Sequence, residues 1–320
     1  MSLLQETLPN GVRLDSCTFC QLSCPECSVG KGDYGDFGKG CLKFDDFVKF
    51  VEMNPFVQRI EIANRGEIFL NPDLSKIMEF ARAKNVLLTA MNGVNFNTVS
   101  DAVIESLVVN KFLALSINVD AVNQKAYKKY RHGGNFSTVI NNIKKLWICK
   151  KTYSSNFPLV NLLYQIFKHN SSREELQAAK KMAKDLDATL YFCKDRVFYY
   201  IPEDTDMIYE ETGLAYPKTT FEYEDNFTRT ANPPCLDLWK FPSINYDGKF
   251  LGCSYNGTGI SDLNVFELGL KKCLESEVVQ KTKKMLMGDE ICEESPCCLC
   301  WHYRQFVWHD AFITPNEIGA

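Results

Sequence analysis

Apolar and polar positions alternate in two distinct periods between residues 10 and 195. Short apolar runs that are typical of buried strands cover residues 12–16, 59–63, 86–91, 112–119, 159–167 and 188–192. Amphipathic stretches with helical spacing separate these runs and cover residues 44–51, 73–84, 99–109, 136–147 and 173–186. Six strands that alternate with helices predict an α/β fold with parallel pairing through right-handed crossovers. The pattern alone suits a doubly wound sheet and a barrel equally.

Two of the predicted helices carry start signals. Asn71 and Pro72 open the second helix, as a cap followed by proline at the first helical position. Ser172 precedes the fifth helix, and Glu175 follows it by three residues, which is the spacing of a capping box.

The alternation stops near residue 195, which places a domain boundary near residue 200. We therefore expect one domain over residues 1–200 and a smaller one over 201–320. Residues 199–234 read as irregular, and residues 241–253 read as a short hairpin that turns at Asp247 and Gly248. Two further helices are predicted over 265–277 and 278–287.

Composition is ordinary for a globular protein. Of the 320 residues 45% are hydrophobic and 24% charged, and the net charge is -4. No block of Lys and Arg stands out, so we expect no nucleic-acid partner. No apolar run has membrane-spanning length, and the first residues lack a signal-peptide pattern, so we expect a cytoplasmic protein without a membrane partner.

The 14 cysteines change this picture because they are clustered. In a large chain without an export signal, clustered thiols are more often metal ligands than disulfide partners. One group lies near the N-terminus, at Cys17, Cys20, Cys24 and Cys27, and seven lie after residue 234. Cys41, Cys149 and Cys193 are scattered between them and are expected to be buried small hydrophobes.

Cys20, Cys24 and Cys27 follow the first strand, at the strand end where active sites of parallel α/β folds gather. Three thiolates can hold three irons of a cubane cluster and leave the fourth iron open. An open position distinguishes a catalytic metal site from a closed structural one. The alternative is a zinc site made by the same three thiolates with a distant fourth ligand such as Cys17.

The spacing Cys20-x3-Cys24-x2-Cys27 resembles the signature of the radical S-adenosylmethionine (SAM) superfamily. The resemblance implies a partial (β/α)6 TIM-like barrel and a [4Fe-4S] cluster whose open iron binds SAM and cleaves it to a 5′-deoxyadenosyl radical. It also implies an electron donor such as flavodoxin or ferredoxin. One position departs from the family, because Glu26 replaces the usual aromatic residue before the third cysteine.

Further segments resemble the family's SAM-binding motifs. Gly66 and Glu67 match the end of a Gly-Gly-Glu motif that receives the SAM amino group, with Arg65 in place of the first glycine. Asn118 and Asp120 end the fourth strand, where relatives approach the SAM ribose and carboxylate.

Arg131 lies in a Tyr-Arg-x-Gly-Gly-x-Phe stretch that is common in family members with cluster-bearing C-terminal extensions. This arginine suits a bidentate pair with the SAM carboxylate. A structural arginine at a helix end is the alternative.

The C-terminal cysteines resemble SPASM and twitch extensions. Cys235, Gly248 and Cys253 fit the hairpin pattern, and Cys297 and Cys300 supply a second pair, so four thiolates are available to enclose an auxiliary [4Fe-4S] cluster. Phe306 lies where a full SPASM domain needs another cysteine, which favours the shorter twitch form.

Three cysteines remain near this second set. Cys273, Cys292 and Cys298 are left over, and any of them could replace an assigned ligand. The alternative for the whole set is a structural zinc ribbon.

The resemblance implies an oxidoreductase in which the auxiliary cluster accepts an electron from the substrate. About sixteen residues precede the first cysteines, so we expect no fused leader-binding domain and favour a small metabolite such as a sugar or alcohol. The alternatives are a maturase of a ribosomal peptide and, more remotely, a non-catalytic zinc-binding scaffold. No catalytic acid or base can be named, although the stretch 199–230 offers Asp and Tyr side chains.

Overall fold

A computed structural model of the chain describes residues 8–194, 200–216 and 234–319. One parallel sheet has the strand order β6-β5-β4-β3-β2-β1-β7. Its strands are β1 Gly11–Leu14, β2 Arg59–Glu61, β3 Leu87–Val94, β4 Ala114–Asn118, β5 Leu159–Ile166, β6 Thr189–Lys194 and β7 Ser243–Ile244. All six predicted strands are present, and the fold is a partial TIM-like barrel.

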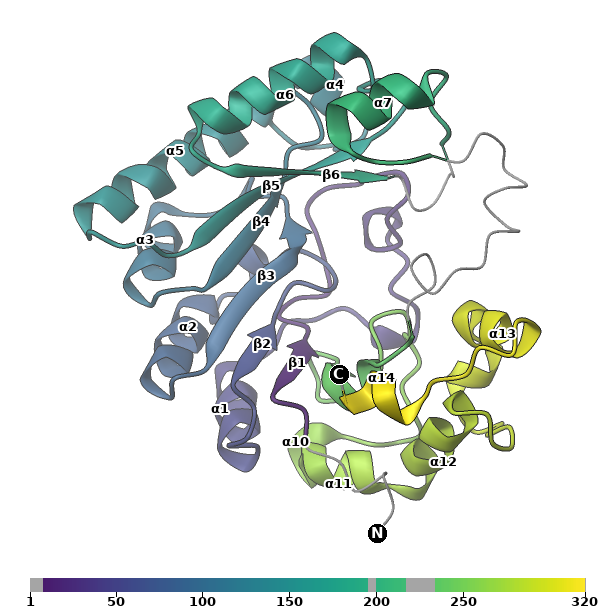
Figure 1. Ribbon diagram of the computed structural model, residues 1–320. Helices are drawn as coiled ribbons and strands as arrows, with labels where there is room; N and C mark the ends of the chain where they lie inside the picture. The colour runs from purple at the N-terminus through teal and green to yellow at the C-terminus, as the bar shows by residue number, and fades with distance from the viewer. Residues whose placement is uncertain (1–7, 195–199, 217–233, 320) are drawn as a thin grey trace.

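Helices cover one side of this sheet, and the loop after β1 and the C-terminal segment lie on the other side (Figure 1). The helices that alternate with the strands are α1 Phe44–Met53, α2 Leu74–Ala83, α3 Asp101–Val109, α4 Gln124–Tyr127, α5 Phe136–Thr152 and α6 Arg173–Asp185. The later helices are α7 Thr205–Thr212, α9 Asp237–Lys240, α10 Val265–Leu268, α11 Leu270–Glu275, α12 Glu277–Leu286, α13 Trp301–Trp308 and α14 Pro315–Gly319. Among the described residues, no helix is both long enough and apolar enough to cross a bilayer.

The seventh strand was not predicted as part of the sheet. β7 is the first arm of the predicted hairpin and pairs in parallel with β1 through Leu14 and Ile244. The hairpin turn is confirmed, because the Gly248 N–H donates to the Asn245 carbonyl over 3.0 Å. Gly248 has a φ of 88°, and a Cβ there would lie 2.4 Å from the Asn264 side chain, so the turn requires glycine.

Some predicted boundaries are wrong for local reasons. Helix α2 begins at Leu74 and not at Pro72, because the Asn71 Oδ1 accepts the Asp73 N–H over 2.9 Å in a preceding turn. The predicted helix over 265–277 is broken at Gly269, and the stretch expected to be irregular contains α7. The cap of α6 is confirmed, since the Ser172 Oγ accepts the Glu175 N–H over 3.3 Å.

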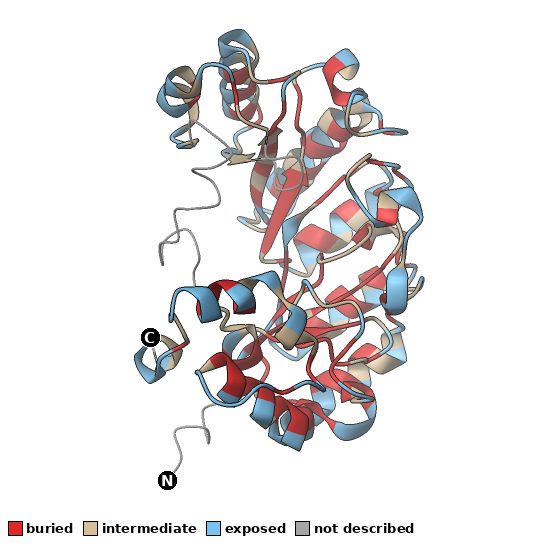
Figure 2. Ribbon diagram, turned by 90° about the vertical axis from the view of Figure 1, so that its right-hand side faces the viewer, coloured by how far each residue is buried: buried red, intermediate tan, exposed pale blue. Residues whose placement is uncertain are grey.

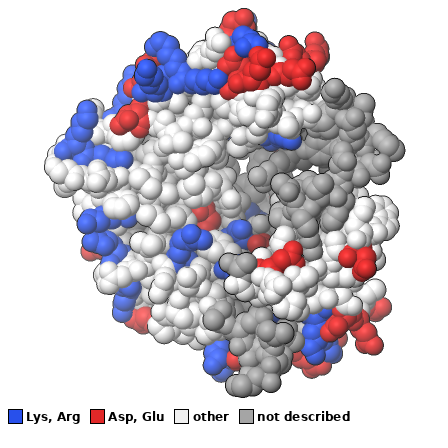
Figure 3. Space-filling model, in the orientation of Figure 1, with Lys and Arg blue, Asp and Glu red and all other residues white. Residues whose placement is uncertain are grey.

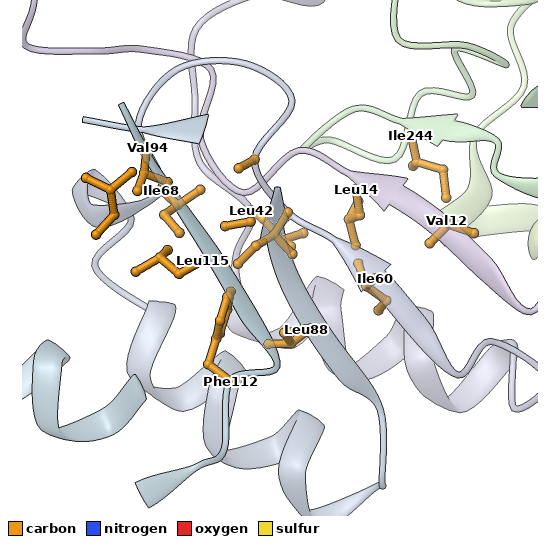
Figure 4. Packing of buried hydrophobic residues seen from close by; sticks show 14 of the residues in the cluster. Val12, Leu14, Leu42, Ile60, Ile68, Leu88, Val94, Phe112, Leu115 and Ile244 are labelled. Atoms are coloured by element: carbon orange, nitrogen blue, oxygen red, sulfur yellow. The ribbon is translucent and has the colours of Figure 1, made fainter. Parts of the chain in front are cut away.

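The core is continuous across the sheet. Figure 2 shows buried residues concentrated in the strands and on the helix faces turned toward them. Leu14, Ile60, Leu88 and Leu115 come from four neighbouring strands and are at most 4% exposed (Figure 4). Each such side chain contributes about 1.5–3 kcal/mol when fully buried. The sheet is therefore a stable platform for the loops at its C-terminal edge.

Candidate functional site

The three N-terminal cysteines lie on the long loop between β1 and α1. This loop leaves the sheet at the C-terminal edge, and the turns that follow β2, β3 and β4 leave from the same edge because all these strands are parallel. Cys24 is buried, Cys20 is half-buried and Cys27 is exposed.

Two of these thiols have nitrogen donors beside them. The Cys20 Sγ accepts from the Leu22 N–H and from the Asn95 Nδ2, each over 3.4 Å. The Arg131 Nη1 donates to the Cys24 Sγ over 3.8 Å. Burial raises the pKa of Cys20 to about 12, and it also raises the pKa of Cys24 against the opposing effect of Arg131. Both thiols are therefore neutral without metal, and binding a metal would release protons.

The turn that holds Gly66 and Glu67 packs directly on the cysteine loop. The Glu67 N–H donates to the Phe19 carbonyl over 2.9 Å. A Cβ on Gly66 would lie 2.4 Å from the Cys17 carbonyl oxygen and 2.6 Å from that of Phe19, and its φ is 63°. Only glycine allows this approach of the two backbones.

The Glu67 carboxylate points into the protein beneath this turn. It accepts from the Asn95 N–H over 2.6 Å and from the Phe69 N–H over 3.3 Å. Burial raises the pKa of Glu67 to about 7, although both hydrogen bonds oppose the shift.

The two charged residues predicted to contact SAM pair with each other. The Arg131 Nε and Nη2 lie 2.6 and 2.5 Å from the Asp120 Oδ2. The Gln165 N–H donates to the other Asp120 oxygen over 2.7 Å. In this arrangement Arg131 connects a strand end to Cys24, and the predicted contact of its guanidinium with the SAM carboxylate stays a prediction. Asn118 lies against Gly93, where a Cβ would be 2.5 Å from its side-chain nitrogen.

Asn95 was missed by the sequence reasoning. Its backbone binds Glu67, and its side chain binds Cys20 and accepts the Gln21 Nε2 over 2.8 Å. Its position just after β3, at the functional edge of the sheet, was the available signal.

Four C-terminal cysteines line one cavity of about 400 Å³. They are the predicted ligands Cys235, Cys253, Cys297 and Cys300. Cys235 lies just before α9, Cys253 ends the hairpin, and the segment before α13 supplies the others. The remaining wall is mostly apolar and aromatic and includes Tyr255, Leu286, Leu299, Trp301, His302 and Tyr303.

Burial also affects the thiols of this cavity. It raises the pKa of Cys297 to about 12 and raises the pKa of Cys235 and Cys253. Neighbouring thiols of the set also raise these pKa values.

The three leftover cysteines do not line this cavity. Cys273 is fully buried in the core, and Cys292 is 6% exposed with its Sγ 4.0 Å from the Val278 carbonyl. The Cys298 Sγ lies 3.9 Å from the Glu293 carbonyl.

The other cysteines lie apart from both sets. Cys17 and Cys41 are free thiols, and the Cys41 Sγ donates to the Cys17 Sγ over 2.9 Å. Cys41, Cys149 and Cys193 are half-buried, so the expectation that they are buried is wrong.

Within the described ranges, no three His, Cys, Asp or Glu side chains converge closely enough to hold one metal ion. A cubane does not require such convergence, because each thiolate binds a different iron. The donor set of each cysteine group fits a cluster in which every thiolate binds its own iron.

Arg65 joins three parts of the chain. Its Nη1 lies 2.9 Å from the Asp15 Oδ2, and its Nη2 lies 2.9 and 2.8 Å from the carbonyl oxygens of Ser254 and Asn256. Its guanidinium also lies 4.9 Å from the centre of the Phe37 ring. Desolvation raises the pKa of Asp15 to about 6, although Arg65 opposes the shift.

A charge cluster lies on the face shown in Figure 3. Figure 3 shows acidic and basic side chains gathered over α6 and α7 at the top of the molecule. Arg173 pairs there with Glu210 and Glu211 over 2.9 and 2.7 Å. The charges at this exposed cluster are balanced, so it is typical of a solvated surface.

No protein-family model matches the chain, and no curated protein matches it. Among solved structures, the crystal structure of Streptococcus suis SuiB bound to S-adenosylmethionine is similar, with a TM-score of 0.63 and 12% identity over 86% of this chain. A second crystal structure of SuiB has a TM-score of 0.62 and 14% identity over 85% of this chain. The chain spans 65% and 67% of the length of these two structures. At this identity the likeness shows a shared fold.

Proposed function

We propose that this chain is a radical SAM enzyme in which Cys20, Cys24 and Cys27 hold three irons of a [4Fe-4S] cluster. The observation that carries the proposal is that the turns after β2 and β3 and the arginine beyond β4 all reach the cysteine loop. The Gly66–Glu67 turn binds its backbone, Asn95 donates to Cys20, and Arg131 donates to Cys24. Nitrogen donors beside the sulfurs are typical of iron–sulfur sites.

The fold likeness supports the same proposal. The SuiB structure that shares this fold contains SAM. A cluster held by Cys20, Cys24 and Cys27 would supply the electron for reductive cleavage of SAM and so for removal of a substrate hydrogen, and a second cluster would supply an electron acceptor. The chain's own part is to place the reacting groups and to exclude water.

Several residues would perform that placement. The backbone of the Gly66–Glu67 turn would face the SAM amino group, and the buried Glu67 carboxylate would anchor this turn to the Asn95 and Phe69 N–H groups. The buried pair of Asp120 and Arg131 fixes the charge beside Cys24. Asn118 supplies a polar group at the end of β4 for the ribose or carboxylate. Gly66 lets the turn approach the cluster loop closely enough for these contacts.

The second cluster would be held by Cys235, Cys253, Cys297 and Cys300. Four unpaired thiols around one largely apolar cavity support this assignment. A fully ligated cluster has no open iron, so its natural role is to transfer electrons. We therefore propose a net two-electron oxidation of the substrate.

The test is anaerobic reconstitution followed by iron and sulfide analysis. We expect about eight irons per chain, from two cubanes. Replacement of Cys20, Cys24 and Cys27 by Ala should leave about four irons and abolish formation of 5′-deoxyadenosine. A matched control replaces Cys149, Cys193 and Cys298 by Ala and should keep both clusters and SAM cleavage. Stoichiometric zinc without iron, or SAM cleavage by the first variant, would overturn the proposal.

A further inference from the structure

Arg65 stands where the resemblance leads one to expect glycine, and its side chain leaves the SAM-binding turn. The side chain is 11% exposed, and its carboxylate partner on Asp15 is 1% exposed. Its Nη2 binds two carbonyls of the segment that immediately follows Cys253. One buried guanidinium thus connects the end of β1, the turn of Gly66 and the cavity of the C-terminal cysteines.

The two carbonyls belong to the residues that directly follow Cys253. The Asn256 N–H donates back to the Cys253 carbonyl over 3.3 Å, so this segment turns closely around Cys253. The Ser254 carbonyl that Arg65 binds and the Tyr255 N–H are the two ends of a single peptide group. A cation at the oxygen end fixes this peptide and polarises it, which strengthens the N–H at the other end as a donor.

We propose that Arg65 is a positioning residue for the auxiliary cluster, which it tunes through the Ser254–Tyr255 peptide. This role rests on the proposed function, because it requires a cluster bound to Cys253. N–H donors to cluster sulfurs and nearby positive charge both favour the reduced, more negative state. Loss of Arg65 removes the cation from the two carbonyls and frees the peptide that follows Cys253. Both changes make reduction of the cluster less favourable.

The experiment isolates the auxiliary cluster. The background is the chain with Cys20, Cys24 and Cys27 replaced by Ala, and Arg65→Gln and Arg65→Lys are added to it separately. The midpoint potential is measured by an anaerobic redox titration followed by electron paramagnetic resonance. We expect Arg65→Gln to lower the equilibrium constant for reduction about tenfold, or about 59 mV for a one-electron couple.

The lysine variant keeps the charge and loses the planar fork, so it should shift the potential in the same direction by less. Arg65→Lys also keeps the role of Arg65 testable if Arg65→Gln fails to fold. Arg173→Gln is the control, because this arginine also pairs with carboxylates but lies at the surface over α6. Its potential should equal that of the background.

The outcomes separate the two proposals. If the background chain binds no cluster, the auxiliary-cluster proposal fails, and the role of Arg65 fails with it. If the cluster assembles and both Arg65 variants keep the background potential, only the role of Arg65 is overturned. A lower melting temperature with an unchanged potential is the signature of a purely structural arginine and also overturns it.

Discussion

Gly66→Ala tests whether the SAM-motif turn really packs on the cysteine loop. At a φ of 63° an alanine carries about 1–2 kcal/mol of backbone strain. An alanine at any left-handed position carries the same strain, whether or not the position is packed. The added methyl group would also lie 2.4 Å from the Cys17 oxygen, 2.6 Å from the Phe19 oxygen and 2.7 Å from the Phe19 nitrogen. These are backbone atoms that cannot rotate away, so overpacking lowers the free energy of unfolding by roughly a further 1–3 kcal/mol.

Gly213→Ala is the matched control. Gly213 also has a left-handed backbone, with a φ of 73°, but a Cβ there would have no heavy atom within 4 Å. The control therefore reports the backbone strain alone. We expect the free energy of unfolding to fall by about 1–2 kcal/mol for Gly213→Ala and by about 2–5 kcal/mol for Gly66→Ala.

The assay is equilibrium urea unfolding of the metal-free, reduced protein, so the comparison does not depend on any cofactor. SAM binding by the reconstituted protein is measured in parallel by calorimetry. Gly66→Ala should weaken SAM binding because the Glu67 N–H loses its bond to Phe19, and Gly213→Ala should not. Equal losses of stability in the two variants would refute the close packing of the turn on the loop.

Three further predictions concern pH, packing and ligation. The raised pKa of Asp15 means that its protonated form stabilises the fold below about pH 4, and up to about 3 kcal/mol of this stabilisation is lost as the pH rises through about 6. Asp15→Asn should therefore make the free energy of unfolding, measured with urea, depend less on pH between about pH 4 and 7. A wild-type slope that persists in the variant would contradict this. Leu162→Ala should reduce the free energy of unfolding by about 2–5 kcal/mol, whereas Leu159→Ala on the same strand, 53% exposed, should change it by less than about 0.5 kcal/mol in the same assay. Cys298→Ser should leave the iron content at its wild-type value, and Cys297→Ser should lower it, as measured by iron analysis; a loss in the first variant would reassign the ligand.

The strands of the barrel could be predicted because their signal is local. The first two predicted strands alternate apolar and polar residues, and the later ones are mostly apolar over several residues; both patterns are typical of strands. β7 could not be predicted in the same way, since it has two residues and exists only because Ser243 and Ile244 meet the edge of β1. Its identity depends on tertiary pairing and not on its own pattern.

The cysteine groups could also be recognised, because ligand spacing is a local property of the chain. The cavity shared by Cys235, Cys253, Cys297 and Cys300 is what that spacing predicts, although the sequence left open whether Cys292 or Cys298 would replace a member. In the structure neither of these two cysteines lines the cavity, because Cys292 is 6% exposed beneath α12 and the Cys298 Sγ lies 3.9 Å from the Glu293 carbonyl. The choice of the four ligands stays a prediction.

The residues that sequence reasoning missed are those whose partners lie far along the chain. Asn95 reaches Cys20 across 75 positions, and Arg65 reaches Ser254 and Asn256 across 189 and 191. From the sequence alone, Arg65 only departs from a glycine motif. A long charged side chain next to the glycine that contacts another backbone would be expected to destabilise the turn. The structure removes the conflict, because Gly66 alone makes the close contact and the side chain of Arg65 runs the other way, toward the hairpin. A motif position that tolerates arginine must have a buried acceptor for it, since an unpaired buried cation would cost several kcal/mol. Asp15 and the two carbonyls are that acceptor, so the departure from the motif and the contact between the two cysteine regions have the same physical cause.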